Sequence, residues 1–125
     1  MTPRNNRRTT TSPATAGAEQ LKERVKFLSD LEPFNGLSKL ELERVARSIV
    51  ERIAAAGESV LVESGVPGTE LYVVHDGTLE LVHKDAVVAL ITRGEVFGHP
   101  TLLTGRAPEF TTRARGESKL YCIPR

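Results

Sequence analysis

Residues 71–91, LYVVHDGTLELVHKDAVVALI, decide the fold. They form three short runs rich in apolar residues, separated by two turn pairs, Asp76-Gly77 and Lys84-Asp85. A two-residue turn of either kind joins neighbouring antiparallel strands. The stretch therefore predicts three strands, at residues 71–75, 78–83 and 86–91, joined as hairpins.

The two turns predict one register. A turn at Asp76-Gly77 pairs His75 with Thr78, and a turn at Lys84-Asp85 pairs His83 with Ala86. Both registers place the same residues on one face, which we expect to be the interior: Tyr72, Val74, Leu79, Leu81, Val88 and Leu90. The opposite face is also apolar, so we expect it to be partly covered.

The flanking sequence also alternates between short strands and turn residues. Residues 59–63, SVLVE, predict a strand, and Val66-Pro67-Gly68 suits a type II turn with glycine at the positive φ. Short strands separated by turn signals every eight to twelve residues indicate an antiparallel barrel or jelly roll. The predicted fold class is mainly β, an eight-stranded antiparallel jelly roll over residues 57–125.

Two amphipathic helices are predicted before the roll, within residues 18–56. Apolar residues from Ala18 recur at helical spacing, and Pro33 and Gly36 end that helix. Ser38 and Glu41 have the spacing of a capping box. The second helix is predicted to carry Leu42, Val45, Ala46, Ile49, Val50 and Ile53 on one side and to end near Gly57.

Residues 1–17 contain almost nothing that can be buried and are predicted to be a disordered tail. The net charge of +1 excludes a strong global attraction to nucleic acid or membranes. No run of 18 apolar residues and no apolar signal core occurs, which predicts a cytoplasmic protein. Cys122, the only cysteine, lies in an apolar strand and is predicted to be a small buried hydrophobe.

Residues 97–114, FGHPTLLTGRAPEFTTRA, read as one turn of helix, a loop and a strand. A helix start suits an anion, because its first amides have no partner within the helix. The amides of Thr101 and Leu102 are candidate donors, whereas Pro100 has none.

The sequence predicts no enzyme. It contains no phosphate-binding loop, no nucleophile elbow and no His-x-His metal pair. His75 and His83 are expected beside turns. Arg113 and Arg115 share one side of a strand, where they form either a solvated face or an anion patch.

Residues 57–82, GESVLVESGVPGTELYVVHDGTLELV, and 90–98, LITRGEVFG, resemble the cyclic-nucleotide-binding domain of catabolite-activator-type regulators, kinase regulatory subunits and gated channels. The resemblance implies a phosphate-binding cassette at Phe97 and Gly98. The family's glutamate falls on His99. Its arginine falls on Pro108 when Thr111 and Ala114 are aligned with the family's threonine and alanine, or on Glu109 if the loop is one residue longer.

Neither position holds a cation. Losing a buried charge-assisted pair costs about 3–5 kcal/mol, so tight cyclic-AMP binding by the family's usual route is not expected. Arg106 in a shortened loop, or a protonated His99, would be the alternative cation. The candidate ligand-binding residues are Phe97, Gly98, His99, Thr101, Leu102, Arg106, Pro108 and Glu109.

A narrower resemblance, carried by residues 97–114 and by LYCIPR at 120–125, is to the N-terminal domain of prokaryotic signalling proteins with CBS and nucleotidyltransferase-like domains. It implies a regulatory domain that senses a nucleotide or other small anionic ligand and acts on downstream domains. The family's lid helix is not expected within residues 1–125, which indicates a fragment. The alternative is a ligand-free docking or dimerisation module, such as a homodimer.

Overall fold

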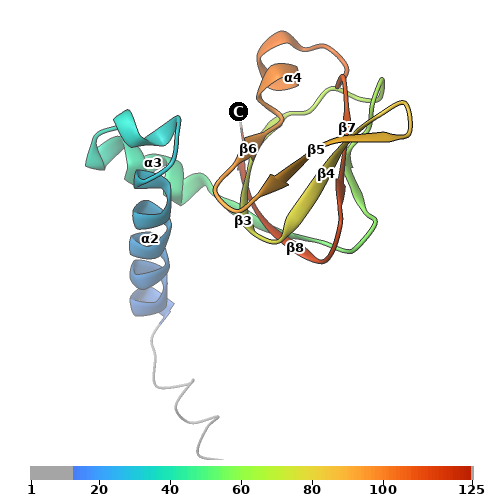
Figure 1. The fold of residues 1–125 in the computed structure, drawn as a ribbon. Helices are drawn as coiled ribbons and strands as arrows, with labels where there is room; N and C mark the ends of the chain where they lie inside the picture. Colours follow the sequence, from blue (N-terminus) through green and yellow to red (C-terminus); the bar gives the residue numbers. More distant parts are fainter. Residues whose placement is uncertain (1–12, 125) are drawn as a thin grey trace, which may run out of the picture. The chain divides into compact units, whose positions relative to one another are not determined.

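The computed structural model describes residues 13–124 (Figure 1). The chain divides into two compact units, of which the first ends at Arg47 and the second runs from Ser48 to Arg125. We call the second the β unit. Within residues 13–124, no helix combines the length and the apolar character that crossing a membrane requires.

The first unit is helical. It contains helix α2 (Pro13–Ser29), the 3-10 turn η1 (Phe34–Gly36) and helix α3 (Lys39–Ser48). Helix α2 begins five residues before the expected start at Ala18, because proline suits a first helical turn and alanine favours a helix. The expected disorder is therefore wrong for residues 13–17, and residues 1–12 lie outside the described part.

The predicted capping box at the start of α3 is confirmed. The Ser38 amide donates to Glu41 Oε1 at 2.9 Å, and the Glu41 amide donates to Ser38 Oγ at 3.2 Å. The Ser38 hydrogen bonds lower the pKa of the Glu41 carboxyl. Two of the unpaired amides of the helix start are satisfied in this way.

The predicted end of the second helix is wrong. Helix α3 stops at Ser48, and residues 50–54 form strand β1, which pairs antiparallel with strand β8. Ile49, Val50 and Ile53 have helical spacing, but their β-branched side chains also suit a strand. Pairing with β8, 64 or more residues away in sequence, overrides the local periodicity.

The β unit contains eight antiparallel strands in two four-stranded sheets, which confirms the predicted mainly β class. The sheet orders are β1-β8-β3-β6 and β2-β7-β4-β5 (Figure 1). The strands are β1 (Val50–Ala54), β2 (Ser59–Leu61), β3 (Glu70–Asp76), β4 (Thr78–His83), β5 (Ala86–Thr92), β6 (Val96–Phe97), β7 (Thr111–Ala114) and β8 (Ser118–Pro124).

Asp76-Gly77 does not close a hairpin, so that prediction is wrong. Strands β3 and β4 belong to different sheets, and Gly77 lies where the chain crosses from one sheet to the other. Its φ is 104°, and a Cβ there would lie 2.3 Å from Ser118 Oγ. Glycine is required at this corner because strand β8 passes so close.

The turn at Lys84-Asp85 is a tight hairpin, as predicted, with φ values of 50° and 67°. His83 pairs with Ala86 as expected, but a bulge between Leu81 and Val82 shifts the later pairs by one residue. A bulge inserts one extra residue into a ladder and so reverses the faces beyond it.

This shift corrects the predicted interior face. Ile91 pairs with Leu79 and is 6% exposed, whereas Val88 and Leu90 are 53% and 46% exposed. The other predicted interior residues hold: Tyr72, Val74 and Leu79 are buried and Leu81 packs against the core.

Gly68 does not take a positive φ, so the predicted type II turn at Val66-Pro67-Gly68 is wrong. The turn lies earlier, at Glu63 and Ser64, where Ser64 has a φ of 60°. Strand β2 accordingly ends at Leu61 rather than at residue 63.

Cys122 is buried in the core, as predicted. Burial raises the pKa of its thiol to about 11, which keeps it protonated at neutral pH. The remaining core residues are Ala54, Leu61, Tyr72, Val74, Leu79, Ile91, Phe97, Ala114 and Leu120.

Candidate functional site

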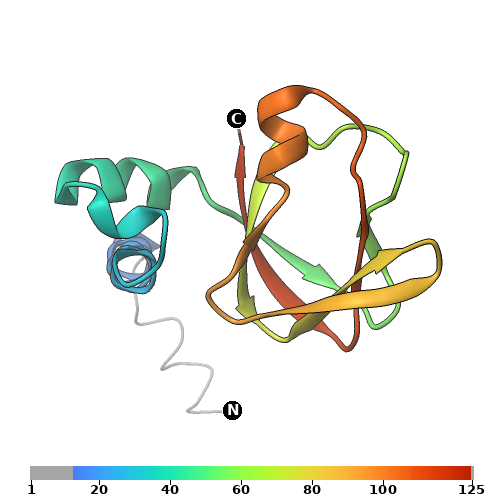
Figure 2. The same ribbon diagram turned by 45° about the horizontal axis from the view of Figure 1, so that its top comes forward.

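A cavity of about 700 Å³ lies in the β unit beside helix α4 (His99–Thr104). Helix α4 lies between strand β6 and the segment that leads into β7 (Figure 2). Seven of the eight candidate residues line this cavity, namely Phe97, Gly98, His99, Thr101, Arg106, Pro108 and Glu109. The predicted short helix and loop of residues 97–114 therefore do enclose a space.

Gly98 directs the chain into α4. Its φ is 89°, and a Cβ there would lie 2.9 Å from Tyr72 Cδ2 and 3.0 Å from the Glu70 carbonyl oxygen. Phe97, immediately before it, stacks on Tyr72 with the ring centroids 4.8 Å apart. The aromatic-glycine pair thus packs the start of α4 against β3.

Thr101 is buried and joins three segments. Its Oγ1 accepts from the Gly68 amide at 3.0 Å and donates to the Arg106 carbonyl, and its carbonyl accepts from the Gly105 amide at 2.8 Å. The side chain of Thr101 therefore holds the loop around the cavity in place.

Leu102 does not line the cavity, in contrast to its place among the candidate residues. Its amide donates to the Gly98 carbonyl at 3.1 Å. That amide is used within α4, so its predicted role as an anion donor is wrong.

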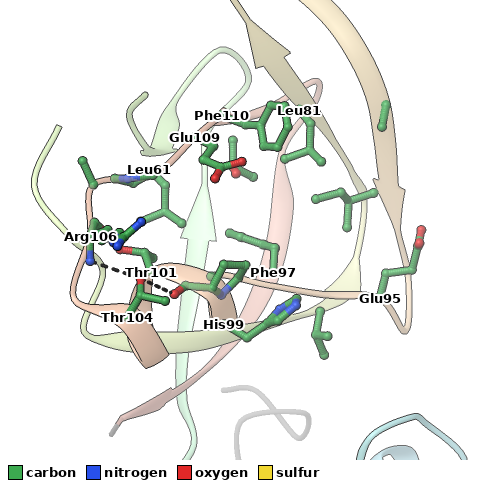
Figure 3. A pocket seen from close by; sticks show the side chains of 18 of the residues that line it. Leu61, Leu81, Glu95, Phe97, His99, Thr101, Thr104, Arg106, Glu109 and Phe110 are labelled. Carbon is green, nitrogen blue, oxygen red and sulfur yellow. Dashed lines mark hydrogen bonds between the residues drawn. The ribbon is translucent and has the colours of Figure 1, made fainter. Parts of the chain in front are cut away.

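Pro108 and Glu109, the two positions aligned with the family's arginine, both line the cavity. Pro108 is buried, and its carbonyl accepts from the Ser64 amide at 2.9 Å. Glu109 is exposed, and its carboxylate points into the cavity (Figure 3).

Arg106 and His99 line the cavity with exposed side chains. Within residues 13–124, Arg106 carries the one guanidinium among the lining residues. Glu95 also lines the cavity, but its Oε1 accepts from the Thr92 amide at 2.8 Å and from the Thr92 hydroxyl at 3.0 Å.

Sequence reasoning missed part of the walls that the strands provide. They are mostly apolar, and their residues include Leu61, Leu81, Ala89, Leu90, Ile91, Val96 and Phe110. Leu81 and Leu90 were among the predicted interior residues. Ala89 and Ile91 could have been found only if the bulge had been known, because it decides which residues of β5 face inward.

Within residues 13–124, no group of three or more His, Cys, Asp or Glu residues is arranged to hold a metal ion. His83 contacts Glu63, with Nδ1 2.8 Å from Oε2. Arg113 Nη2 lies 3.0 Å from Glu80 Oε1. This ion pair neutralises one of the two arginines, Arg113 and Arg115, of the possible anion patch.

Comparison with known proteins found a family model, described as cyclic nucleotide-binding domain, that matches residues 52–125. The chain is 29% identical over 103 residues to the cAMP-dependent protein kinase regulatory subunit of Schizosaccharomyces pombe, covering 82% of this chain and 23% of the subunit. It spans between 6% and 23% of the length of the curated relatives that it matches.

Two solved structures share the fold. One is the regulatory domain of Toxoplasma gondii PKA with cAMP, with a TM-score of 0.80 and 20% identity over 87% of this chain and 44% of that one. The other is the regulatory subunit of a cAMP-independent protein kinase A from Trypanosoma cruzi bound to guanosine, with a TM-score of 0.77 and 20% identity over 86% and 40%.

Proposed function

The chain belongs to the cyclic nucleotide-binding domain family, and on this premise we propose that it is a non-enzymatic regulatory domain that senses a nucleotide-type ligand. The ligand would occupy the cavity beside α4, and its capture would be signalled to attached domains. A nucleoside, a nucleotide or another small anionic ligand meets this description.

The observation that carries the proposal is the composition of the cavity. Its volume of about 700 Å³ falls within the range of small-molecule sites, and its walls are apolar with a few polar groups at the rim. A flat base can bury its faces against side chains such as Phe97, Ile91 and Phe110. Arg106, at the rim, can face a phosphate.

We further propose that the cassette is degenerate. A proline and a carboxylate stand at the two positions aligned with the family's arginine, and both line the cavity. Without a charge-assisted pair at this place, a cyclic phosphate is expected to be held about 3–5 kcal/mol less tightly. That corresponds to roughly two to four decades in the dissociation constant.

Signalling would use the bonds that join α4 to the rest of the β unit. Thr101 links α4 to the loop before β3 through Gly68, so a ligand that moves α4 also moves that loop. Such a segment with two arrangements is what a ligand can bias. The likeness to prokaryotic CBS-domain and nucleotidyltransferase-like proteins stays a prediction about the attached domains.

Isothermal titration of the 125-residue chain tests the proposal. The panel contains adenosine, guanosine, cyclic AMP, cyclic GMP, AMP, ATP and a cyclic dinucleotide. At least one compound is expected to bind, and Arg106→Gln is expected to weaken the anionic ones about fivefold. Arg115→Gln, an exposed arginine that does not line the cavity, is the matched control.

The alternative, a ligand-free docking or dimerisation module, is favoured by the exposure of Val87 and Val88 on β5, at the edge of its sheet within the described residues. Sedimentation velocity over a range of concentrations separates the two functions. A flat titration panel together with concentration-dependent dimerisation would contradict the sensing role.

A further inference from the structure

The backbone around Glu109 is anchored on both sides. The Pro108 carbonyl accepts from the Ser64 amide at 2.9 Å, and Thr111 Oγ1 accepts from the Glu63 amide at 2.9 Å. The Glu109 carbonyl itself lies 3.3 Å from His83 Nδ1. This short segment of the cavity wall is therefore fixed to two other parts of the chain.

His83 is in turn held in place. Its Nδ1 lies 2.8 Å from Glu63 Oε2, and Glu63 Oε1 accepts from the Lys84 amide at 3.1 Å. The imidazole also contacts the ring of Phe110 edge-on, with the centroids 5.6 Å apart. Contacts from two loops thus support the segment that carries Glu109, and this limits the positions that its carboxylate can occupy.

The carboxylate of Glu109 is different from the other acid of the lining. Glu95 is already engaged by Thr92. For the side-chain oxygens of Glu109, by contrast, no hydrogen bond or ion pair occurs with any residue in the range 13–124. They point into the cavity (Figure 3), so they are available to a ligand.

We propose that Glu109 sets the ligand class of the cavity, selecting uncharged nucleosides over their phosphorylated forms. A nucleoside has ribose hydroxyls that can donate to the carboxylate, and hydrogen bonds to charged groups are the stronger ones. A 3′,5′-cyclic phosphate removes two of these donors and adds a negative charge, which the carboxylate repels. This inference rests on the proposed function, since it concerns the same cavity.

Titration calorimetry with adenosine and cyclic AMP on the 125-residue chain, wild type and Glu109→Gln, tests the inference. The wild type is expected to bind adenosine more tightly than cyclic AMP. Glu109→Gln is expected to bind adenosine about fivefold less tightly, because a neutral acceptor replaces a charged one. Its affinity for cyclic AMP is expected to rise about twofold to fivefold as repulsion is lost.

Glu117→Gln is the control, because it removes the same charge at an exposed carboxylate that does not line the cavity. It should leave the ratio of the two affinities unchanged. A wild-type preference for cyclic AMP, or an equal ratio in Glu109→Gln and wild type, would overturn the inference and leave the proposed function standing. Failure of every compound in the panel to bind would overturn both.

Discussion

The hydroxyl of Thr101, on α4, accepts a hydrogen bond from the amide of Gly68, on the loop before β3, at 3.0 Å. The same hydroxyl donates to the carbonyl of Arg106. One buried side chain therefore satisfies two backbone groups from segments on either side of it. This pair of bonds joins the two loops that border α4, and the shape of the cavity depends on them.

Thr101→Val is expected to destabilise the chain by about 1–3 kcal/mol, because a methyl group of similar size leaves the Gly68 amide and the Arg106 carbonyl unpaired. Urea unfolding followed by circular dichroism measures the change. Thr101→Ser retains the hydroxyl, so its free energy of unfolding should fall much less. Thr104→Val is the second control: its hydroxyl also makes two hydrogen bonds, to the Pro100 carbonyl and from the Arg106 amide, but both are exposed to water. The loss there should be smaller, and an equal loss would contradict the role given to Thr101.

Gly98→Ala is expected to cost about 1–3 kcal/mol from its left-handed backbone alone, with a further loss because the new Cβ would meet Tyr72 and the Glu70 carbonyl. Gly105→Ala is the matched control. Gly105 has a φ of 69° but has nothing within 4 Å of the added Cβ, so it carries only the backbone cost. Thermal unfolding of the two variants should separate the cost of the left-handed backbone from the cost of the steric contact. Equal losses of stability in both variants would show that the contact with Tyr72 is not tight.

The sequence predicted the class of fold because its turn residues are local signals. Lys84-Asp85 and the Ser38 capping box depend on neighbours within a few residues, and both were confirmed. The Asp76-Gly77 hairpin failed because a glycine at positive φ serves a sheet crossing as well as a hairpin. Which of these applies is decided by contact with Ser118, far along the chain.

The candidate site was largely predictable, since Phe97 to Glu109 are contiguous and their order follows the family's pattern. Its walls were not fully predictable, because the bulge between Leu81 and Val82 leaves no mark in the sequence and changes which residues of β5 face inward.

The wrong prediction at Leu102 has a different cause. A helix of six residues uses the amide of its fourth residue in its own first hydrogen bond, and the sequence does not reveal where so short a helix begins.

Stability is expected to fall in alkali because of Tyr72. Burial, reinforced by the charge of Glu70, raises the pKa of its hydroxyl from 10.0 to about 12. The folded state therefore favours the protonated form. The contribution of the protonated Tyr72 hydroxyl to the free energy of unfolding is complete below pH 10. It is lost as the pH rises from 10 towards 12, and the loss amounts to about 2–3 kcal/mol.

Urea unfolding at pH 8 to 12 measures this loss. Tyr72→Phe should flatten the decline above pH 10. The pKa of Cys122 is also raised, from 9.0 to about 11, so Cys122→Ala should remove the earlier part of the decline, above pH 9. A decline in Tyr72→Phe as steep as in the wild type would contradict the assignment.

We propose that the cavity beside α4 is a ligand site in which Pro108 stands at the position of the family's arginine. The most direct test is the affinity for cyclic AMP of the double variant His99→Glu, Pro108→Arg, measured by titration calorimetry beside the wild type. Restoring the glutamate and the arginine is expected to raise the affinity about a hundredfold or more. A variant that unfolds with the same cooperativity as the wild type, yet binds cyclic AMP no better, would contradict the claim.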